Sequence, residues 1–115
     1  MKPLEPGATR VCCLEDIVPN TGVAALVDGK QVAVFRLRDD GTSGDSVHAI
    51  GNFDPFSRAN VLSRGIVGDL SGEPVVASPV YKQHFSLLTG RCLEDTSVTV
   101  PVFRALVDGA DVFVL

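Results

Sequence analysis

The sequence predicts an all-β protein, and three observations support this class. The chain of 115 residues contains 18 Val, 3 Ile and 6 Thr, whose β-branched side chains suit a pleated strand better than a helix. Apolar residues fall in short runs bounded by turn residues such as Gly, Asp and Pro. No stretch keeps the apolar period of a helix long enough for three confident turns. Many short strands of this kind are typical of a small β-sandwich or barrel.

The strands are expected wherever an apolar run of four to eight residues lies between turn residues. The clearest runs read VAALV, QVAVFRL and SVHAI. A short helical turn is predicted after Asp54-Pro55, because Pro suits the first position of a helix. The predicted strands cover about residues 9–14, 22–27, 31–38, 46–51, 66–69, 74–78, 83–87, 101–107 and 111–115.

One five-residue phrase occurs twice in the chain. ALVDG covers residues 25–29 and again 105–109, each time followed within three residues by a strand-like run. Asp-Gly between apolar strands favours a two-residue hairpin turn, in which both central residues have positive φ. Because nothing between residues 30 and 104 repeats, the phrase predicts two hairpins with the same turn rather than a duplicated domain.

Two long segments, 52–65 and 88–100, are predicted to lack strands. Unstructured loops of this length are uncommon in compact domains and often functional. The whole chain, residues 1–115, is predicted to form one domain, because its length suits a single core.

Charge and composition exclude several classes of partner. The chain carries 10 Lys and Arg against 14 Asp and Glu, a net charge of −4, which disfavours binding to nucleic acid or to anionic lipid. No run of eighteen apolar residues is present, so no membrane span is predicted. The first ten residues, MKPLEPGATR, lack the apolar segment of a signal peptide. We therefore expect a cytoplasmic protein.

The potential metal ligands and nucleophiles are few and scattered. Cys12, Cys13 and Cys92 form no CxxC pair, and His48 and His84 form no HxH or HExxH pair. We expect buried or half-buried reduced thiols. Glycine motifs that cradle phosphate are also missing. Composition and spacing thus predict no catalytic residue and no metal site.

The segment 47–90 carries a more specific pattern. It reads VHAIGNFDPFSRANVLSRGIVGDLSGEPVVASPVYKQHFSLLTG and resembles the Rieske-type iron–sulfur domain, whose two cluster loops contain CxH and CPxHxxxFxxxTG. Asn52 and Asp54 stand at the Cys and His positions of the first loop, and Ser78 and Tyr81 at those of the second. The resemblance implies a Rieske-like fold with two long loops at a vacated cluster site.

The four substitutions remove the ligand chemistry of that family. A Rieske cluster needs two thiolates on one iron and two imidazoles on the other. Here an amide, a carboxylate, a hydroxyl and a phenol replace them, so we expect no cluster and no cofactor in this chain. Lys82 also occupies the place of the small Gly that usually follows the second His.

A Rieske frame without ligands is similar to the small subunit of assimilatory NAD(P)H-dependent nitrite reductase, the NirD family. The phrases GNFDPF and LSRGIVG, together with SP and KQ in the second loop, carry this resemblance, which extends over roughly residues 8–115. It implies a heteromer whose large subunit carries FAD, a [4Fe–4S] cluster and sirohaem and reduces nitrite to ammonium. It implies no catalytic residue in this chain, which would be a structural or regulatory subunit.

Two roles are open for the residues of the vacated site. Asn52, Asp54 and Ser78 are expected to hydrogen-bond the two loops together, and Asp54 with Lys82 is a hypothetical ion pair. Pro55, Phe56 and Tyr81 are predicted to be exposed at the loop tips and, with Lys82, to be candidate contacts to the large subunit.

Two alternative functions remain at this point. One is a Rieske-type ferredoxin-like electron-transfer component, which would require a cluster. The other is a stand-alone protein-binding module that keeps the fold for a different partner.

Overall fold

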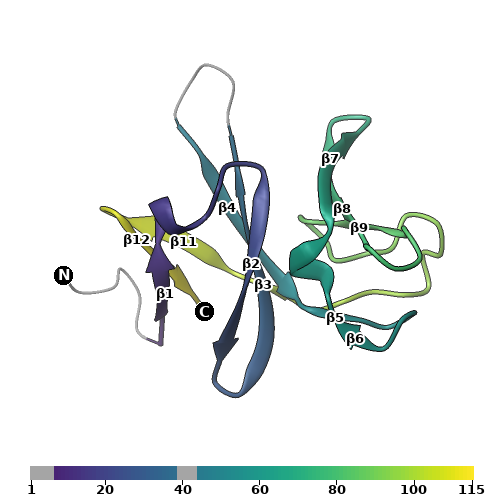
Figure 1. The fold of residues 1–115 in the computed structure, drawn as a ribbon, viewed down its shortest axis with the longest axis horizontal. Helices are drawn as coiled ribbons and strands as arrows, with labels where there is room; N and C mark the ends of the chain where they lie inside the picture. The colour runs from purple at the N-terminus through teal and green to yellow at the C-terminus, as the bar shows by residue number, and fades with distance from the viewer. Residues whose placement is uncertain (1–6, 39–43) are drawn as a thin grey trace.

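The computed structural model describes residues 7–38 and 44–115, in which nearly all regular structure is strand (Figure 1). Two short 3-10 helices, η1 (Leu14–Asp16) and η2 (Leu62–Arg64), interrupt the strands. The predicted all-β class is confirmed. The strands are β1 (Thr9–Cys13), β2 (Thr21–Val27), β3 (Lys30–Leu37), β4 (Ser46–Gly51), β5 (Phe53–Asp54), β6 (Ala59–Asn60), β7 (Ile66–Leu70), β8 (Glu73–Ala77), β9 (His84–Ser86), β10 (Val102–Phe103), β11 (Ala105–Asp108) and β12 (Asp111–Val114).

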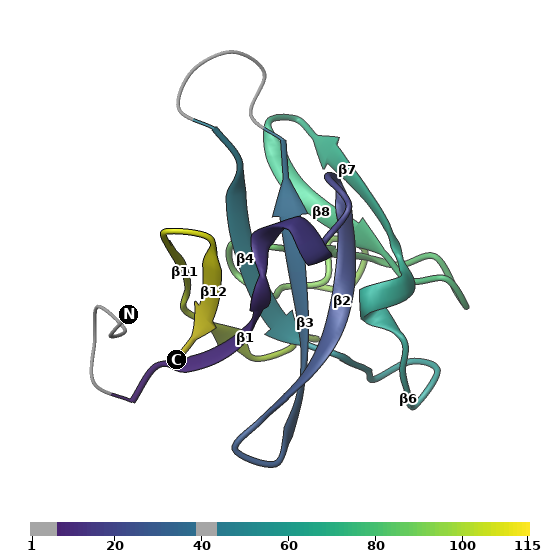
Figure 2. The same ribbon diagram turned by 60° about the vertical axis from the view of Figure 1, so that its left-hand side comes forward.

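The strands pair into antiparallel sheets. The central sheet has the order β10-β4-β3-β2, a second has the order β1-β12-β11, and a third has the order β7-β8-β9. β5 and β6 form a separate two-stranded hairpin. In Figure 1 β2, β3 and β4 lie in the middle, with β11 and β12 on one side and β7 and β8 on the other. In the turned view of Figure 2 β11 and β12 remain on one side, whereas β7 and β8 overlap the upper parts of β2 and β3.

The strand β3 lies between two apolar cores. Ala33 and Phe35 belong to the core that reaches β8, β9 and the loops after them, whereas Val32 and Val34 belong to the core shared with β12. All four side chains have no exposed surface. Alternate side chains of a strand point to opposite faces, so the continuous apolar run VAVF, residues 32–35, is the pattern of a strand buried on both sides.

The two ALVDG hairpins use different turns. Asp28 and Gly29 both have positive φ, 50° and 76°, and connect the paired residues Val27 and Lys30, as predicted. In the second hairpin Asp108 still belongs to β11 and pairs with Asp111, so the turn residues are Gly109 and Ala110. The expectation of identical turns was therefore wrong, because the register between β11 and β12 is shifted by one residue relative to the phrase.

The short helical turn predicted after Asp54-Pro55 is present at residues 55–58, where the N–H of Arg58 donates to the Asp54 carbonyl four residues earlier over 2.7 Å. Two other local predictions were wrong. The segment 52–65 is not free of strands, because β5 and β6 form within it. The predicted strand 101–107 divides at Arg104: β10 pairs with β4, whereas β11 pairs with β12. A local apolar run does not show that its two halves join different sheets.

Within residues 7–38 and 44–115, the structure has no helix with the length and hydrophobicity needed to cross a bilayer.

Candidate functional site

The two loops of the vacated site are joined by a buried hydrogen bond. Asp54, at the end of β5, and Ser78, directly after β8, have exposed fractions of 0% and 1%. The Ser78 hydroxyl donates to Asp54 Oδ2 over 2.5 Å, and the backbone N–H of Phe56 donates to Oδ1 over 2.9 Å. A hydrogen bond to an ionised carboxylate is stronger than a neutral one. This confirms the expectation that these two residues connect the loops.

Asn52 organises the first loop in a similar way. Its side chain is 1% exposed, and its Oδ1 accepts a hydrogen bond of 2.8 Å from the backbone N–H of Ser63 in η2. Its Nδ2 donates to Gln31 Oε1 and to the carbonyl of Asn60, each over 3.3 Å. The amide therefore bonds to β3, β6 and η2, and its carbonyl oxygen is already occupied. These bonds lie within β3 and the first loop, so the prediction that Asn52 joins the two loops was wrong.

The second loop is a tight turn between Ser78 and Gln83. The N–H of Ser78 donates to the Gln83 carbonyl over 2.9 Å, and the N–H of Lys82 donates to the Ser78 carbonyl over 3.1 Å. Lys82 has φ of +66°, a left-handed conformation that glycine adopts more readily than any other residue. Tyr81, in the same turn, is 60% exposed.

The residues at the four cluster positions do not fit an iron–sulfur cluster. The family chemistry needs two thiolates and two imidazoles. Asn52, Asp54 and Ser78 use their oxygens in the internal hydrogen bonds described above, and the remaining position holds the largely exposed phenol of Tyr81. Among residues 7–38 and 44–115, no group of three or more His, Cys, Asp or Glu side chains is placed to hold a metal ion.

Two predictions about the tip were wrong. Lys82 forms no ion pair with Asp54 in the described part of the chain, because the Asp54 carboxylate faces inward to Ser78 and Phe56. Pro55 and Phe56 are only partly exposed. The Phe56 ring packs on the core, 6.2 Å from the ring of Phe85. An aromatic side chain beside a loop tip is thus used to hold the first loop to the core.

A hollow of about 350 Å³ lies beside this tip. Ile66, at the start of β7, is 74% exposed and pairs with Ala77 of β8 at the edge of the hollow. The preceding Gly65 is required there, since a Cβ would overlap the Ala77 carbonyl oxygen. The residues lining the hollow are Arg64, Ile66, Ala77, Ser78, Pro79, Lys82 and His84. Sequence reasoning did not identify Arg64, Ile66 or His84 here, because no motif marks them.

His84 and Cys92 meet through Glu94 and not directly. The ring Nδ1 of His84 lies 2.6 Å from Glu94 Oε2, and the thiol of Cys92 donates to Glu94 Oε1 over 3.7 Å. Burial raises the pKa of the Cys92 thiol above its ordinary value. Burial also acts to raise the pKa of the Glu94 carboxyl, but hydrogen bonds from His84 outweigh it and the net pKa is lowered. A thiol with a raised pKa is a poor nucleophile at neutral pH.

The other cysteines are free and partly exposed. Cys12 and Cys13 lie at the end of β1, and burial raises the pKa of the Cys12 thiol. The described chain thus has the free, buried or half-buried thiols that the sequence predicts.

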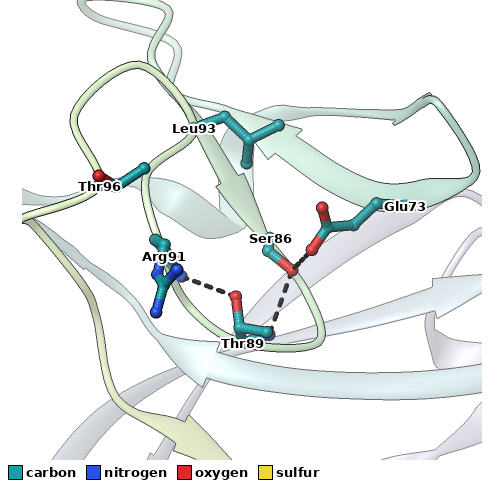
Figure 3. A pocket seen from close by; sticks show the side chains of 6 residues that line it. All are labelled: Glu73, Ser86, Thr89, Arg91, Leu93 and Thr96. Carbon is teal, nitrogen blue, oxygen red and sulfur yellow. Dashed lines mark hydrogen bonds between the residues drawn. The ribbon is translucent and has the colours of Figure 1, made fainter.

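A second hollow, of about 260 Å³, lies over the turn after β9 (Figure 3). The Ser86 hydroxyl donates to Glu73 Oε2 over 2.5 Å and accepts from the N–H groups of Leu88 and Thr89. The N–H of Arg91 donates to the Thr89 hydroxyl. These bonds fix the turn that includes Thr89-Gly90, so the polar atoms of Glu73, Ser86 and Thr89 have a structural role.

Comparison with known proteins identifies a family and close relatives. Residues 8–115 match the family described as Rieske-like [2Fe-2S] domain. The NADH nitrite reductase small subunit of Salmonella typhimurium is 47% identical over 97 residues, which cover 84% of this chain and 86% of the relative. The solved structure of the Escherichia coli protein NirD has a TM-score of 0.82 and 42% identity, and the match covers 93% of this chain and 94% of that chain.

A further relative carries a similar domain inside a much longer polypeptide. The NAD(P)H nitrite reductase large subunit of Klebsiella oxytoca is 39% identical over 104 residues. The match covers 90% of this chain but only 10% of the Klebsiella chain. In that protein a domain similar to this chain is therefore covalently part of the large subunit.

Proposed function

The chain belongs to the Rieske-like [2Fe-2S] domain family, within it to the small subunits of nitrite reductase, and from this membership we propose that it is the non-catalytic partner of a cofactor-bearing large subunit. The function is assembly: the domain docks on the large subunit and orients or stabilises the protein through which electrons pass from NAD(P)H to nitrite. The subunits form a cytoplasmic heteromer that serves nitrate assimilation.

The Klebsiella relative carries this proposal. A similar domain occurs as a separate chain in some proteins and as a segment of the large subunit in another, and we expect it to have the same neighbour in both arrangements. Fusion keeps the domain at a high effective concentration next to its partner. A separate chain needs a specific interface to reach the same position. This chain must therefore carry a surface that binds the large subunit.

The internal bonding of the site supports a role without electron transfer. Asn52, Asp54 and Ser78 have their oxygens bonded within the chain, so the redox groups would all belong to the large subunit, as FAD, a [4Fe–4S] cluster and sirohaem. The hydrogen bond between Ser78 and Asp54 joins the two loops where a cluster would otherwise hold them. Asn52, Asp54 and Ser78 hold the two loops in the conformation that the docking surface requires.

Co-expression tests the assembly. The tagged chain and its cognate nitrite reductase large subunit are produced together, and the complex is isolated and assayed for NAD(P)H-dependent nitrite reduction. We expect the large subunit to co-purify and activity to follow the complex. A chain that never co-purifies with the large subunit would overturn the proposal and favour a binding module with another partner.

Anaerobic reconstitution tests the ferredoxin alternative. The purified chain is incubated with ferrous iron and sulfide, with a Rieske ferredoxin treated in parallel as the positive control. We expect the visible spectrum of a Rieske centre in the control only. The same spectrum in this chain would support electron transfer by its own cluster and exclude the cofactor-free role.

A further inference from the structure

We propose that the hollow beside the second loop receives an acidic and apolar segment of the nitrite reductase large subunit. The docking surface consists of Arg64, Ile66, Pro79, Val80, Tyr81 and Lys82. The inference rests on the proposed function, because it names the face through which the small subunit meets that partner. The sequence expectation placed Pro55 and Phe56 in this contact, whereas the structure favours β7 and the second loop instead.

Three of the nine exposed large apolar side chains in the described part of the chain lie on this surface. Ile66 is 74% exposed, Tyr81 is 60% exposed and Val80 is 47% exposed. Ile66 also lines the hollow of about 350 Å³ together with Pro79. Aromatic and aliphatic side chains around a concave site are the usual anchors of a protein interface. An apolar side chain of the partner would fill the hollow and cover Ile66.

The charge of the surface is opposite to that of the whole chain. The net charge is −4, yet the segments 52–66 and 77–83 contain three cations, Arg58, Arg64 and Lys82, and only one acid, Asp54, which is buried. Arg64 and Lys82 both line the hollow. The carboxylate of Glu94, which lies beyond these segments, is hydrogen-bonded to the backbone N–H and the ring of His84 and does not line the hollow. Carboxylates of the partner are therefore the complementary groups for the two cations at the hollow.

Two of these cations, Arg58 and Lys82, lie at strained backbone positions. Arg58 and Lys82 have φ of +58° and +66°, in the left-handed region that is unfavourable for long side chains. Each lies four residues after one member of the Asp54–Ser78 hydrogen bond, and its N–H donates to the carbonyl of that member, over 2.7 Å for Arg58 and 3.1 Å for Lys82. The same bonded pair thus supports both turns. Lysine at a position suited to glycine costs stability, and the proposal assigns its side chain to the contact with the partner.

The substitution Lys82→Gly separates binding from folding. Glycine relieves the strain at φ +66°, so the thermal midpoint should stay unchanged or rise, while the affinity for the large subunit should fall by about three- to tenfold. The control is Ser71→Gly, which makes the same change at φ +55° in the β7–β8 turn and should leave affinity unchanged. A loss of binding in a more stable variant is not explained by misfolding.

The substitution Ile66→Glu tests the apolar part of the surface. It places a carboxylate in the hollow, where it would repel an acidic segment, and we expect a loss of affinity of about tenfold or more. The control is Leu26→Glu on β2, where the leucine is 66% exposed and does not line the hollow.

The measurement is the dissociation constant between each variant and the purified, cofactor-loaded large subunit, in low salt and in about 0.5 M NaCl. We expect the wild-type affinity to fall with salt and the Lys82→Gly variant to lose less, since screening acts on the charge pairs. Wild-type affinity in both Lys82→Gly and Ile66→Glu would overturn this docking surface while leaving the small-subunit function intact. Absence of binding by the wild-type chain would overturn both.

Discussion

Replacing Ser78 with Ala is expected to destabilise the protein, because the substitution leaves a buried carboxylate without one of its hydrogen-bond donors. Asp54 has no exposed surface, and its Oδ2 accepts the Ser78 hydroxyl over 2.5 Å. Water does not reach that oxygen in the folded protein. The hydrogen bond from the N–H of Phe56 lies on the other carboxylate oxygen, Oδ1, and does not compensate for the loss.

The magnitude follows from this geometry. A hydrogen bond to a charged group contributes about 1.5 to 3 kcal/mol, and we take about 2 kcal/mol for Ser78→Ala. The hydroxyl also accepts a hydrogen bond of 3.3 Å from the N–H of Val80, but Val80 is exposed and water can replace that bond. With an unfolding entropy of about 2.1 cal/mol/K per residue, 2 kcal/mol lowers the melting temperature of this 115-residue chain by about 8 °C.

A double-mutant cycle with Asp54→Asn isolates the bond. The unfolding free energies of the wild type, both single variants and the double variant are measured by urea titration at neutral pH. After Ser78→Ala the Asp54 Oδ2 has no hydrogen-bond donor, so Asp54→Asn should cost less in that background, with a coupling of about 1 to 2 kcal/mol. Ser46→Ala, at an exposed hydroxyl of β4, should change stability by less than about 0.5 kcal/mol. Additive effects of the two site substitutions would refute the reasoning.

Three further substitutions test other parts of the structure. Lys82→Met should leave the unfolding free energy within about 0.5 kcal/mol of wild type, because Lys82 has no ion pair with Asp54. A loss of about 2 kcal/mol in urea unfolding would instead show that Lys82 and Asp54 form an ion pair. Burial lowers the pKa of His48 below its ordinary value of 6.5, so the unfolded chain takes up this proton at a higher pH than the folded protein. Stability should fall as the pH drops below about 6.5 towards the folded pKa, and His48→Gln should reduce this fall in unfolding curves recorded at pH values between about 7.5 and 5. Gly90→Ala should cost more than about 3 kcal/mol, because Gly90 has φ of +76° and a Cβ would overlap the carbonyl oxygen of Val100. A soluble Gly90→Ala protein with wild-type melting temperature, measured by circular dichroism, would contradict the close approach of these two segments.

Much of the fold was predictable because its signals are local. The predicted strands at 22–27, 31–38 and 46–51 became β2, β3 and β4 with boundaries within one residue. The Asp28-Gly29 turn was also predictable, since both residues tolerate positive φ. By contrast, the hairpin of β5 and β6 has only two residues in each strand, too few for an alternating pattern.

Of the candidate site, the sequence predicted the loop residues but not which side chains are exposed. The loop motif identified Asn52, Asp54 and Ser78, and the structure placed all three in buried hydrogen bonds. Residue type alone did not distinguish the inward Phe56 from the exposed Tyr81, because exposure depends on which side chain the core accommodates. For the same reason the sequence did not indicate that Arg64 and Ile66 share a hollow with Lys82.

The sequence by itself determined the strand content, the frame of the two loops and the loss of thiolate and imidazole ligands, because these depend on residue type and spacing along the chain. Only the tertiary structure decided that Arg104 separates strands of two sheets, that Asp54 bonds Ser78 and not Lys82, and which apolar groups remain uncovered. The physical reason is that these outcomes depend on contacts between residues far apart in sequence, where packing and burial select one partner among several of suitable chemistry.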